Sequence, residues 1–224
     1  MLKAVIFDLD GVITDTAAFH FIAWQKLGNK LGINITEAFN EELKGVDRTE
    51  SLRRILALGN QETAFSEIEK EALATEKNDF YVSLIQEITP ADILPGIAEL
   101  LADLKKHSIK IGLASASKNA PAILTNLGLA DAFDTIVDPS TLKKGKPDPE
   151  IFLQACKQLA IDPAEAIGVE DAYSGVQAIN EAKMYAIGVG DAKTLQAADY
   201  VVPTTRELTY EKISTLWQAH TSKN

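Results

Sequence analysis

Four short and almost continuous apolar runs, each ending in small or polar residues, constrain the fold more than any other feature of the sequence. The runs span 3–8, 109–115, 166–171 and 185–191, and weaker runs of the same kind span 134–138 and 199–203. Continuous rather than alternating apolarity is typical of strands that are covered on both faces. The runs therefore predict a buried parallel sheet.

Helical patterns separate most of these runs, at 96–107, 119–129, 149–160 and 174–184. Strands that alternate with helices form right-handed crossovers and hence a parallel sheet. We therefore expect an α/β fold with a Rossmann-like sheet. The ligands of such a sheet bind beyond the carboxyl ends of its strands, so the residues that follow each strand carry the functional information.

One interval, 16–92, contains no strand candidate. It holds helix-like stretches instead, at 17–32, 37–45, 49–59 and 64–88. We interpret it as a small all-helical domain inserted after the first strand. The expected division is a core domain made of 1–15 and 93–224 and an inserted domain at 16–92.

Composition excludes several classes of partner. The 224 residues are 46% apolar, enough for a core domain and a smaller one, and the net charge is −10 with no Lys/Arg-rich run. This argues against nucleic acid or an anionic membrane as the main partner. The single cysteine, Cys156, allows no disulfide within the chain, and no stretch has the length of a signal peptide or membrane span. We expect a soluble, cytoplasmic protein.

The first strand ends in two aspartates, Asp8 and Asp10. Residues i and i+2 of an extended segment point the same way, so both carboxylates can face one cavity. The same spacing occurs in solvated turns, but a buried strand is an unfavourable place for two unpaired charges. The run at 166–171 ends in Glu170 and Asp171, so four acids are expected at one edge of the sheet.

Such a set of acids, without His or Cys beside it, favours Mg²⁺ as its ligand. For Asp171 an alternative is open, because it precedes a helical pattern and its side chain can cap that helix. After Asp8 and Asp10, Gly11 allows the backbone to turn sharply or to approach a ligand. The acids thus predict a magnesium site at the carboxyl edge of the sheet.

The run at 109–115 continues as "SASKNAP", in which Ser115 or Ser117 can cap the next helix and Pro121 fits its first turn. Hydroxyl and N–H groups at such a strand-to-helix turn also form a seat for phosphate. The two interpretations are compatible. A phosphate at this turn would lie next to the predicted acids, because both follow buried strands of one sheet.

A lysine-rich stretch, "LKKGKPDPEIF", covers 142–152. Lys143 and Lys144 are expected in a solvated loop. Lys146 differs, because Pro147 holds it in an extended conformation at the start of the next helix. It can bring one fixed positive charge to the acids. A metal ion, a hydroxyl, a lysine and two aspartates are the parts that phosphoryl transfer requires.

The chain resembles the haloacid dehalogenase (HAD) superfamily of phosphotransferases. Four motifs carry the resemblance, in this order and each after a strand: "DLDGV", "SAS", "KPDPEIF" and "GVED". It covers the whole chain, and 16–92 matches the helical cap that this superfamily inserts after its first motif. Within the superfamily, "LKGVDRTESLRRIL" and "ASASKNAP" are most similar to the β-phosphoglucomutase group, because simple phosphatases usually lack the cap pattern "KGVxRxxSL".

The resemblance implies a role for each matching residue. Asp8 is the nucleophile that forms an aspartyl-phosphate, and Asp10 is the general acid/base whose backbone carbonyl also binds Mg²⁺. Asp171 is a metal ligand, with Glu170 beside it. The transferring phosphoryl group is held by Ser115, Ala116 and Lys146, and the same rim carries Ser117, Lys118 and Asn119. The second phosphate is held by Gly45, Val46, Arg48 and Ser51, and the sugar is gated or contacted by His20, Lys77 and Asn78.

The residues themselves support these roles unequally. A planar guanidinium such as that of Arg48 suits a phosphate, although an exposed helix arginine is the common alternative. His20 is more often a packing or surface residue on a helix, and Lys77 follows Glu76 on a charged helix. Thr16 lies at the expected junction of the two domains and is a candidate hinge for opening and closing the cap.

The implied activity is that of a mutase, which converts β-D-glucose 1-phosphate to glucose 6-phosphate through the 1,6-bisphosphate. A sugar-phosphate phosphatase, or a mutase for another sugar phosphate, is an alternative with the same nucleophile. A phospho-accepting regulatory protein is another, but the helical insert and Arg48 argue against it, since a switch domain needs no lid of sugar size. The expected partner is a small sugar phosphate, and the expected state is a monomer.

Overall fold

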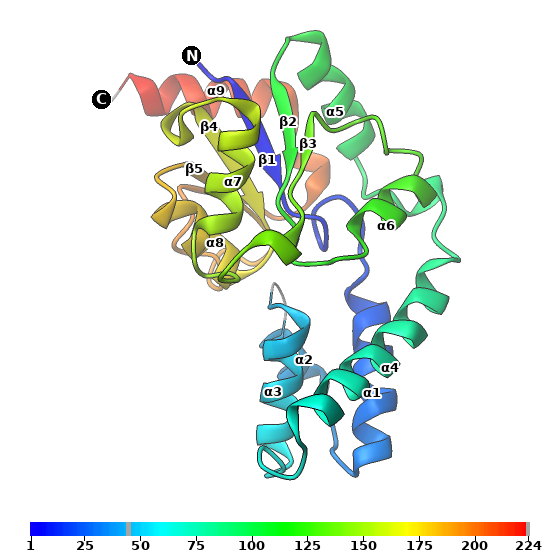
Figure 1. The fold of residues 1–224 in the computed structure, drawn as a ribbon. Coiled ribbons are helices and arrows are strands. Elements are labelled where there is room, and N and C mark those ends of the chain that lie inside the picture. The colour runs from blue at the N-terminus through cyan, green and yellow to red at the C-terminus, as the bar shows by residue number, and fades with distance from the viewer. Residues whose placement is uncertain (44–45, 223–224) are drawn as a thin grey trace.

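The computed structural model describes residues 1–43 and 46–222. In this part of the chain six strands form one sheet in the order β3-β2-β1-β4-β5-β6, and all neighbours are parallel (Figure 1). The strands are β1 (Ala4–Phe7), β2 (Lys110–Leu113), β3 (Thr135–Ile136), β4 (Ala166–Glu170), β5 (Tyr185–Val189) and β6 (Tyr200–Val202). The predicted α/β fold is confirmed, and the two weaker runs also form strands.

Strands β2, β1 and β4 end within one residue of one another in the register of the sheet. Phe7 of β1 is in register with Leu113 of β2 and with Val169 of β4. The backbone of Asp8 then continues the pairing, because its N–H donates to the carbonyl of Val169 at 3.0 Å. The segments that follow β1, β2 and β4 therefore lie side by side at one edge of the sheet, where the predicted site residues are.

Helices cover both faces of the sheet, which explains why the strands are apolar throughout. The helices of this core are α5 (Ile97–Lys106), α6 (Ala120–Asn126), α7 (Glu150–Leu159), α8 (Tyr173–Glu181) and α9 (Tyr210–Thr221). Val5 and Phe7 belong to one apolar cluster, with α5, α6 and α9. Ala4 and Ile6 belong to a second cluster, with α7 and α8. Alternate residues of β1 thus face opposite layers.

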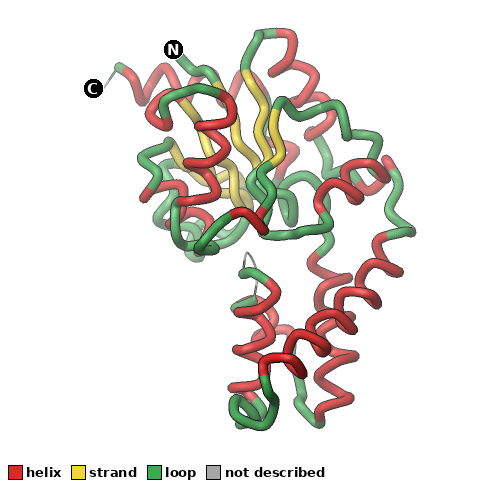
Figure 2. Tube along the Cα trace, viewed as in Figure 1, coloured by secondary structure: helices red, strands yellow, loops and turns green. Residues whose placement is uncertain are grey.

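In the described part of the inserted segment there are four helices: α1 (Ala17–Leu31), α2 (Glu37–Glu41), α3 (Arg48–Leu58) and α4 (Glu67–Ile85). Figure 2 shows that this part consists of helices and loops alone, below the strands of the sheet. It has an apolar cluster of its own, in which Trp24 and Leu27 of α1 pack with Ile55 of α3. An inserted all-helical unit therefore forms, while the boundaries at 16 and 92 remain a prediction.

Helices α3 and α4 of this unit both begin at well-formed side-chain caps. The Ser66 hydroxyl accepts from the Glu69 N–H, and the Glu69 carboxylate accepts in return from the Ser66 N–H, which begins α4. The Asp47 carboxylate accepts from two N–H groups of the first turn of α3. These helix N-caps fix the first turns of α3 and α4, the two helices of the inserted unit that carry Arg48, Ser51, Lys77 and Asn78.

Two linkers join the helical unit to the sheet, and they are hydrogen-bonded to each other. The Thr14 hydroxyl donates to the carbonyl of Asp92 at 2.8 Å, and the N–H of Leu94 donates to the carbonyl of Ile13 at 2.9 Å. The C-terminal half of α4 continues into the core, because Tyr81 packs in the same cluster as β1. The helical unit is therefore anchored beside the end of β1.

Short 3₁₀ turns connect several of these elements, at Pro90–Asp92, Pro139–Thr141, Pro163–Glu165 and Thr205–Glu207. None of the helices within the described residues combines the length and the apolarity that crossing a bilayer would demand.

Candidate active site

A cavity of about 890 Å³ lies between the carboxyl edge of the sheet and the helical unit. Predicted residues from both sides line it: Asp8, Asp10, His20, Val46, Arg48, Ser51, Lys77, Asn78, Ala116, Ser117, Lys118, Asn119, Lys146 and Asp171. Thr16, Ser115 and Glu170 do not line the cavity but are buried. Gly45 lies outside the described residues. The structure thus brings residues from distant stretches of the sequence to one place.

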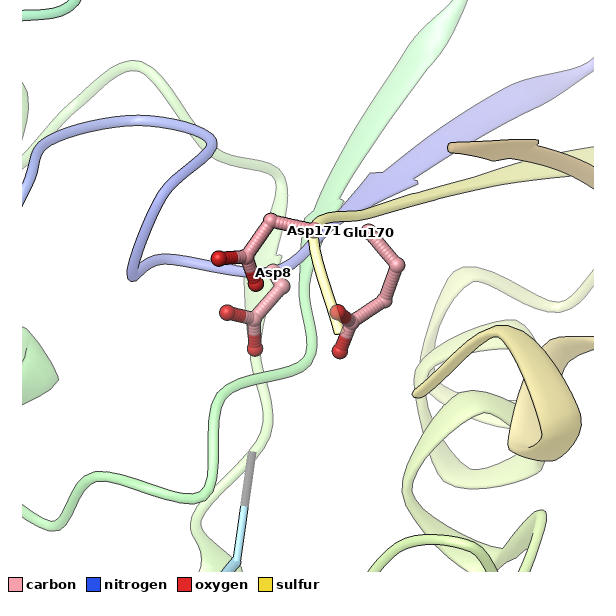
Figure 3. Close-up of side chains that lie close together, drawn as sticks. All are labelled: Asp8, Glu170 and Asp171. Atoms are coloured by element: carbon pink, nitrogen blue, oxygen red, sulfur yellow. The ribbon is translucent and has the colours of Figure 1, made fainter. Parts of the chain in front are cut away.

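Three carboxylates gather at the ends of β1 and β4 (Figure 3). One oxygen from each of Asp8, Glu170 and Asp171 lies within 4.8 Å of the others. Asp8 and Glu170 are buried, and Asp171 is partly exposed. Burial raises the pKa of Asp8 to about 6, with a further contribution from the charge of Glu170, while Lys146 acts in the opposite direction.

Lys146 is the cation that the sequence places among these acids. Its Nζ lies 2.6 Å from Asp8 Oδ1 and 2.6 Å from Glu170 Oε1, and its side chain is 1% exposed. Although burial opposes the charge, the two carboxylates raise the pKa of Lys146 above its ordinary value. Lys143 and Lys144 are exposed, as predicted for a solvated loop, and the Glu150 carboxylate accepts from their backbone N–H groups.

Asp10 is the second acid of β1's carboxyl end, and its Oδ1 has no hydrogen-bond partner among the residues that the structure describes. Burial raises the pKa of Asp10 to about 8, and the charge of Asp8 adds to the effect. A carboxyl group with such a pKa exchanges its proton near neutral pH, which general acid/base catalysis requires.

The donors at this edge fit a hard divalent cation. Asp8, Glu170 and Asp171 all offer carboxylate oxygens, which are among the ligands that Mg²⁺ prefers. Gly11 has φ of +72°, and a Cβ at this residue would lie 2.1 Å from Asp171 Oδ2, so the glycine lets that carboxylate approach the loop. Helix α8 has Ala172 rather than Asp171 as its N-cap. The alternative role of Asp171 as a helix cap is therefore wrong.

The turn after β2 is built by two serine hydroxyls. Ser115 Oγ accepts from the N–H of Ser117, and Ser117 Oγ accepts from the N–H of Asn119. Asn119 is the N-cap residue of α6, so neither serine caps that helix directly. Pro121 stands in the first turn of α6, as predicted. The serines shape the loop that faces Asp8 from the neighbouring strand.

On the cap side, Arg48 is held toward the core. Its Nη2 donates to Asn78 Oδ1 at 2.7 Å, and Asn119 Nδ2 of the core donates to the same oxygen at 2.9 Å. These two bonds connect α3, α4 and the loop before α6. Ser51, one turn along α3, is buried, and its Oγ lies 3.5 Å from the carbonyl of Val46.

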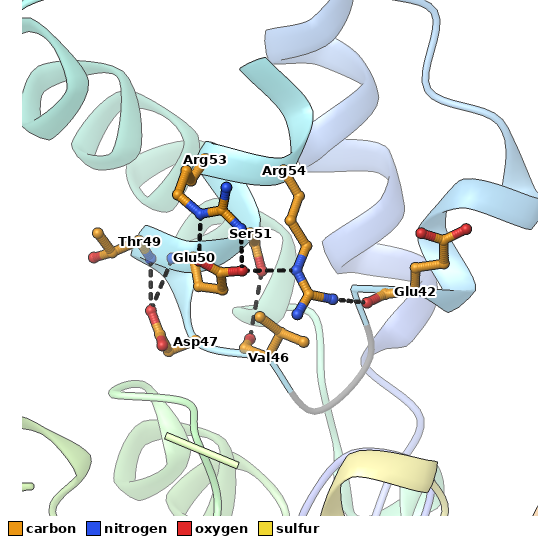
Figure 4. A network of polar contacts seen from close by, with 8 residues as sticks. All are labelled: Glu42, Val46, Asp47, Thr49, Glu50, Ser51, Arg53 and Arg54. Atoms are coloured by element: carbon orange, nitrogen blue, oxygen red, sulfur yellow. Dashed lines mark hydrogen bonds and ion pairs between the residues drawn. The ribbon is translucent and has the colours of Figure 1, made fainter. Parts of the chain in front are cut away.

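The other arginines of α3 have hydrogen-bond partners of a different kind (Figure 4). Arg53 and Arg54 both donate to the carboxylate of Glu50, at 2.7 and 2.9 Å. The hydrogen bond from Arg53 is the main reason that the pKa of Glu50 falls to about 2. Arg53 and Arg54 thus have an acidic partner on their own helix, whereas Arg48 donates to an amide oxygen. A guanidinium has five N–H donors, so Arg48 can also bind an anion at the wall of the cavity.

Four side chains meet between α1 and α4. Each helix contributes two residues one turn apart: His20 and Trp24 from α1, and Lys77 and Tyr81 from α4. Lys77 Nζ lies 2.8 Å from His20 Nδ1 and 4.4 Å from the centre of the Trp24 ring, and His20 stacks on Tyr81. Burial lowers the pKa of Lys77 to about 7, assisted by the charge of Arg48. Burial also lowers the pKa of His20, with Lys77 as a further cause.

Sequence reasoning missed Trp24 and Tyr81, which follow His20 and Lys77 by four residues. Residues i and i+4 share one face of a helix, so this spacing was the available signal. The spacing alone does not mark them as site residues, because aromatic residues at helical spacing are usually core residues. Here they belong to the core and also hold the two polar side chains.

Replacing Lys146 by Met would leave Asp8 and Glu170 buried without their cation. We expect the free energy of unfolding, measured with urea in the presence of EDTA, to fall by about 3–5 kcal/mol. Added Mg²⁺ should recover part of the loss. The exposed Lys143→Met in the same loop serves as the control and should change stability by less than about 0.5 kcal/mol. Equal stabilities of the two variants would contradict the description of Lys146 as a buried counter-ion.

The lowered pKa of Lys77 predicts how the free energy of unfolding depends on pH. Its pKa is about 7 in the folded chain, against an ordinary value of 10.5, so between these values only the unfolded chain binds this proton. Stability contributed at this position should therefore rise with pH from 7 to 10.5. The groups that face Lys77, namely His20, Arg48 and Asp10, remain in Lys77→Met. We expect the difference in free energy of unfolding between the wild type and Lys77→Met, measured with urea, to increase from pH 7 to pH 10.5. A difference that stays constant over this range would contradict the lowered pKa of Lys77.

Comparison with known proteins agrees with the geometry. A model of the haloacid dehalogenase-like hydrolase family matches residues 2–183. The β-phosphoglucomutase of Bacillus subtilis is 50% identical over 219 residues, which is 98% of this chain and 97% of that protein. A phosphorylated carbohydrates phosphatase of Thermotoga maritima is 31% identical over 207 residues, covering 89% of this chain and 93% of the relative.

Among solved structures, the β-phosphoglucomutase (pgmB) of Clostridium difficile superimposes with a TM-score of 0.98. It is 53% identical, and the match covers 99% of this chain and 100% of the other. The motifs, the fold and the relatives thus lead to one assignment. The chain belongs to the haloacid dehalogenase-like hydrolase family and is similar over almost its whole length to β-phosphoglucomutases of that family.

Proposed function

We propose that this protein is a β-phosphoglucomutase, an enzyme that interconverts β-D-glucose 1-phosphate and glucose 6-phosphate. The observation that carries the proposal is a single cavity with positive charge available at both ends. Lys146 lies with Asp8 at the core end, and Arg48 faces the cavity from the cap. A bisphosphorylated sugar needs a charge partner for each phosphate. The 50% identical Bacillus relative supports the same activity.

The reaction would proceed in two transfers. In the first, the phosphorylated Asp8 gives its phosphoryl group to the free hydroxyl of the sugar phosphate, and Asp10 takes the proton of that hydroxyl. The bisphosphate then turns within the cavity. In the second, an oxygen of Asp8 attacks the other phosphorus, the bond from that phosphorus to the sugar oxygen breaks, and Asp10 returns the proton to this oxygen. Asp8 is phosphorylated again at the end.

Asp8, Asp171 and the backbone carbonyl of Asp10 would hold Mg²⁺, with Glu170 beside them. When bound, the ion would neutralise charge on the phosphoryl oxygens. Lys146 contributes a fixed charge at the same place, and Ser115 and Ala116 would hold the remaining phosphoryl oxygens. Ser117, Lys118 and Asn119 would line the rim where the sugar enters.

The helical unit, taken as 16–92, would act as a cap. Val46, Arg48 and Ser51, with Gly45, would bind the phosphate that is not reacting, and His20, Lys77 and Asn78 would contact the sugar. Thr16 would be the hinge. Closure would exclude water, because hydrolysis of the aspartyl-phosphate competes with transfer to the sugar. We further propose a cytoplasmic monomer without a nucleic-acid partner, which the single cysteine and the charge of −10 favour.

A sugar-phosphate phosphatase is the second candidate, and the Thermotoga relative favours it. The two functions share the nucleophile and differ in the acceptor, which is a sugar hydroxyl or water. A coupled assay distinguishes them, with β-D-glucose 1-phosphate as substrate and a trace of the 1,6-bisphosphate. Formation of glucose 6-phosphate, with the β anomer preferred over α, is expected. Release of inorganic phosphate without glucose 6-phosphate would establish the phosphatase.

Arg48→Ala should distinguish binding of the distal phosphate from phosphorylation of Asp8 at the other end of the cavity. It removes the charge partner of the distal phosphate, so we expect the mutase kcat/KM to fall by about 100-fold, in line with loss of a charge-assisted pair. Phosphorylation of Asp8 by the small donor acetyl phosphate, which has no second phosphate, should change little. Arg54→Ala is the control, since Arg54 pairs with Glu50 on its own helix. Equal losses in both reactions would show that Arg48 does not bind the distal phosphate.

A further inference from the structure

A group of lysines lies where the cavity opens to solvent. Lys118, Lys143 and Lys144 line the cavity and are exposed, so they stand at its opening rather than at its buried end. They come from the loop after β2 and from the loop of residues 142–146, which precedes α7. Every charged side chain that these two loops contribute to the cavity wall is a lysine. The core side of the opening is therefore positive, in a chain whose net charge is −10.

The loop before α7 is held in place through its backbone. The Glu150 carboxylate accepts from the N–H groups of Lys143 and Lys144, each at 2.9 Å. A Cβ at Gly145 would lie 3.1 Å from Asp47 Oδ2, so the loop passes close to the residue that begins α3. The two lysines thus have a fixed attachment, while their side chains remain in solvent.

The charges of the two loop lysines are largely free to act on a ligand. Lys143 is without an ion pair within the described part of the chain. Lys144 lies 3.2 Å from Asp148 Oδ2, but its side chain is 73% exposed, so this pair is weak. On the cap side of the cavity, Arg53 and Lys70 each pair with a glutamate of their own helix. The uncompensated positive charge at the opening therefore comes from the core.

The same loop borders both ends of the cavity. Lys146, at its end, lies with Asp8, where the phosphoryl group would be transferred. Gly145 meets Asp47, which directly precedes Arg48, the proposed partner of the distal phosphate. A bisphosphate that turns within the cavity exchanges the places of its two phosphates. The loop lysines lie beside both of these places.

We propose that Lys143 and Lys144 select the sugar bisphosphate over the monophosphates, by drawing it to the opening of the cavity and retaining it while it turns. The inference rests on the proposed mutase function. Each phosphate group carries about two negative charges above its second pKa, so the bisphosphate carries about four. Attraction to a fixed cation is proportional to that charge. Retention matters because a bisphosphate that escapes leaves Asp8 without its phosphoryl group.

The variant Lys143→Gln/Lys144→Gln removes both charges and keeps polar side chains. We would measure the second-order rate constant for phosphorylation of Asp8, by rapid quench at pH 8 and low ionic strength, with the 1,6-bisphosphate or acetyl phosphate as donor. We expect a loss of about tenfold for the bisphosphate and about threefold for acetyl phosphate, because the logarithm of the effect scales with donor charge. Both losses should shrink below about twofold in 0.5 M KCl, where the Debye length is about 4 Å.

Lys106→Gln/Lys157→Gln is the matched control, since it removes the same net charge. Both lysines are exposed and lie in the last turns of α5 and α7, at the amino edge of the sheet and away from the cavity. The control should lower either rate constant by less than about twofold. An equal loss for the two donors in the loop variant, or an equal loss in the control, would overturn the proposal.

Retention of the bisphosphate is measured by isotope trapping. Protein with a labelled phosphoryl group on Asp8 is mixed with glucose 6-phosphate and an excess of unlabelled bisphosphate. Transfer to the C1 hydroxyl forms a labelled bisphosphate, which either turns and yields labelled glucose 1-phosphate or escapes with its label. We expect the escaped fraction to rise several-fold in Lys143→Gln/Lys144→Gln and to stay at the wild-type level in the control. An unchanged fraction in the loop variant would contradict retention.

Failure of the proposed function has a different signature. The label of the wild type would then leave as inorganic phosphate, and no labelled sugar phosphate would form. A wild type that forms labelled glucose 1-phosphate, with a partition that does not depend on Lys143 and Lys144, would contradict only the role of these lysines.

Discussion

A lysine buried between two carboxylates is the interaction on which the rest of the site depends. Lys146 comes from the segment before α7, Asp8 directly follows β1 and Glu170 ends β4. Their contacts therefore join three distant parts of the chain at the edge of the sheet. Such a cluster is costly to bury unless its charges are paired. Asp10 and Asp171 add two more acids at the same edge, where a bound cation would offset the negative charge of the carboxylates.

The cap meets this centre through amides, hydroxyls and aromatic rings. Asn78 Oδ1 accepts hydrogen bonds from Arg48 and from Asn119 of the core, so one oxygen atom connects α3, α4 and the loop after β2. His20, Trp24, Lys77 and Tyr81 form the wall between α1 and α4. In the proposed reaction the core supplies the chemistry, and the cap determines which acceptor reaches it.

Much of the fold could be predicted from local sequence. Continuous apolar runs indicated the strands because both faces of the sheet are covered, and even the short β3 and β6 gave a weak signal. Asp8, Lys146 and Asp171 could be found because charged side chains beside buried strands are unfavourable unless they pair or bind a ligand. Tyr81 and Trp24 could not, since an aromatic residue at helical spacing has the same pattern in a plain core. The Asn78 link was also beyond reach, because it depends on how two helices and a loop meet.

The central claim is that Asp8 carries the phosphoryl group and passes it to a sugar rather than to water. The direct test is to phosphorylate the protein with radiolabelled acetyl phosphate, confirm the label on Asp8 by peptide mapping, and chase with glucose 6-phosphate under rapid quench. We expect the label to appear in a hexose bisphosphate much faster than it is lost without sugar. Label that leaves only as inorganic phosphate, at a rate that sugar does not change, would contradict the claim.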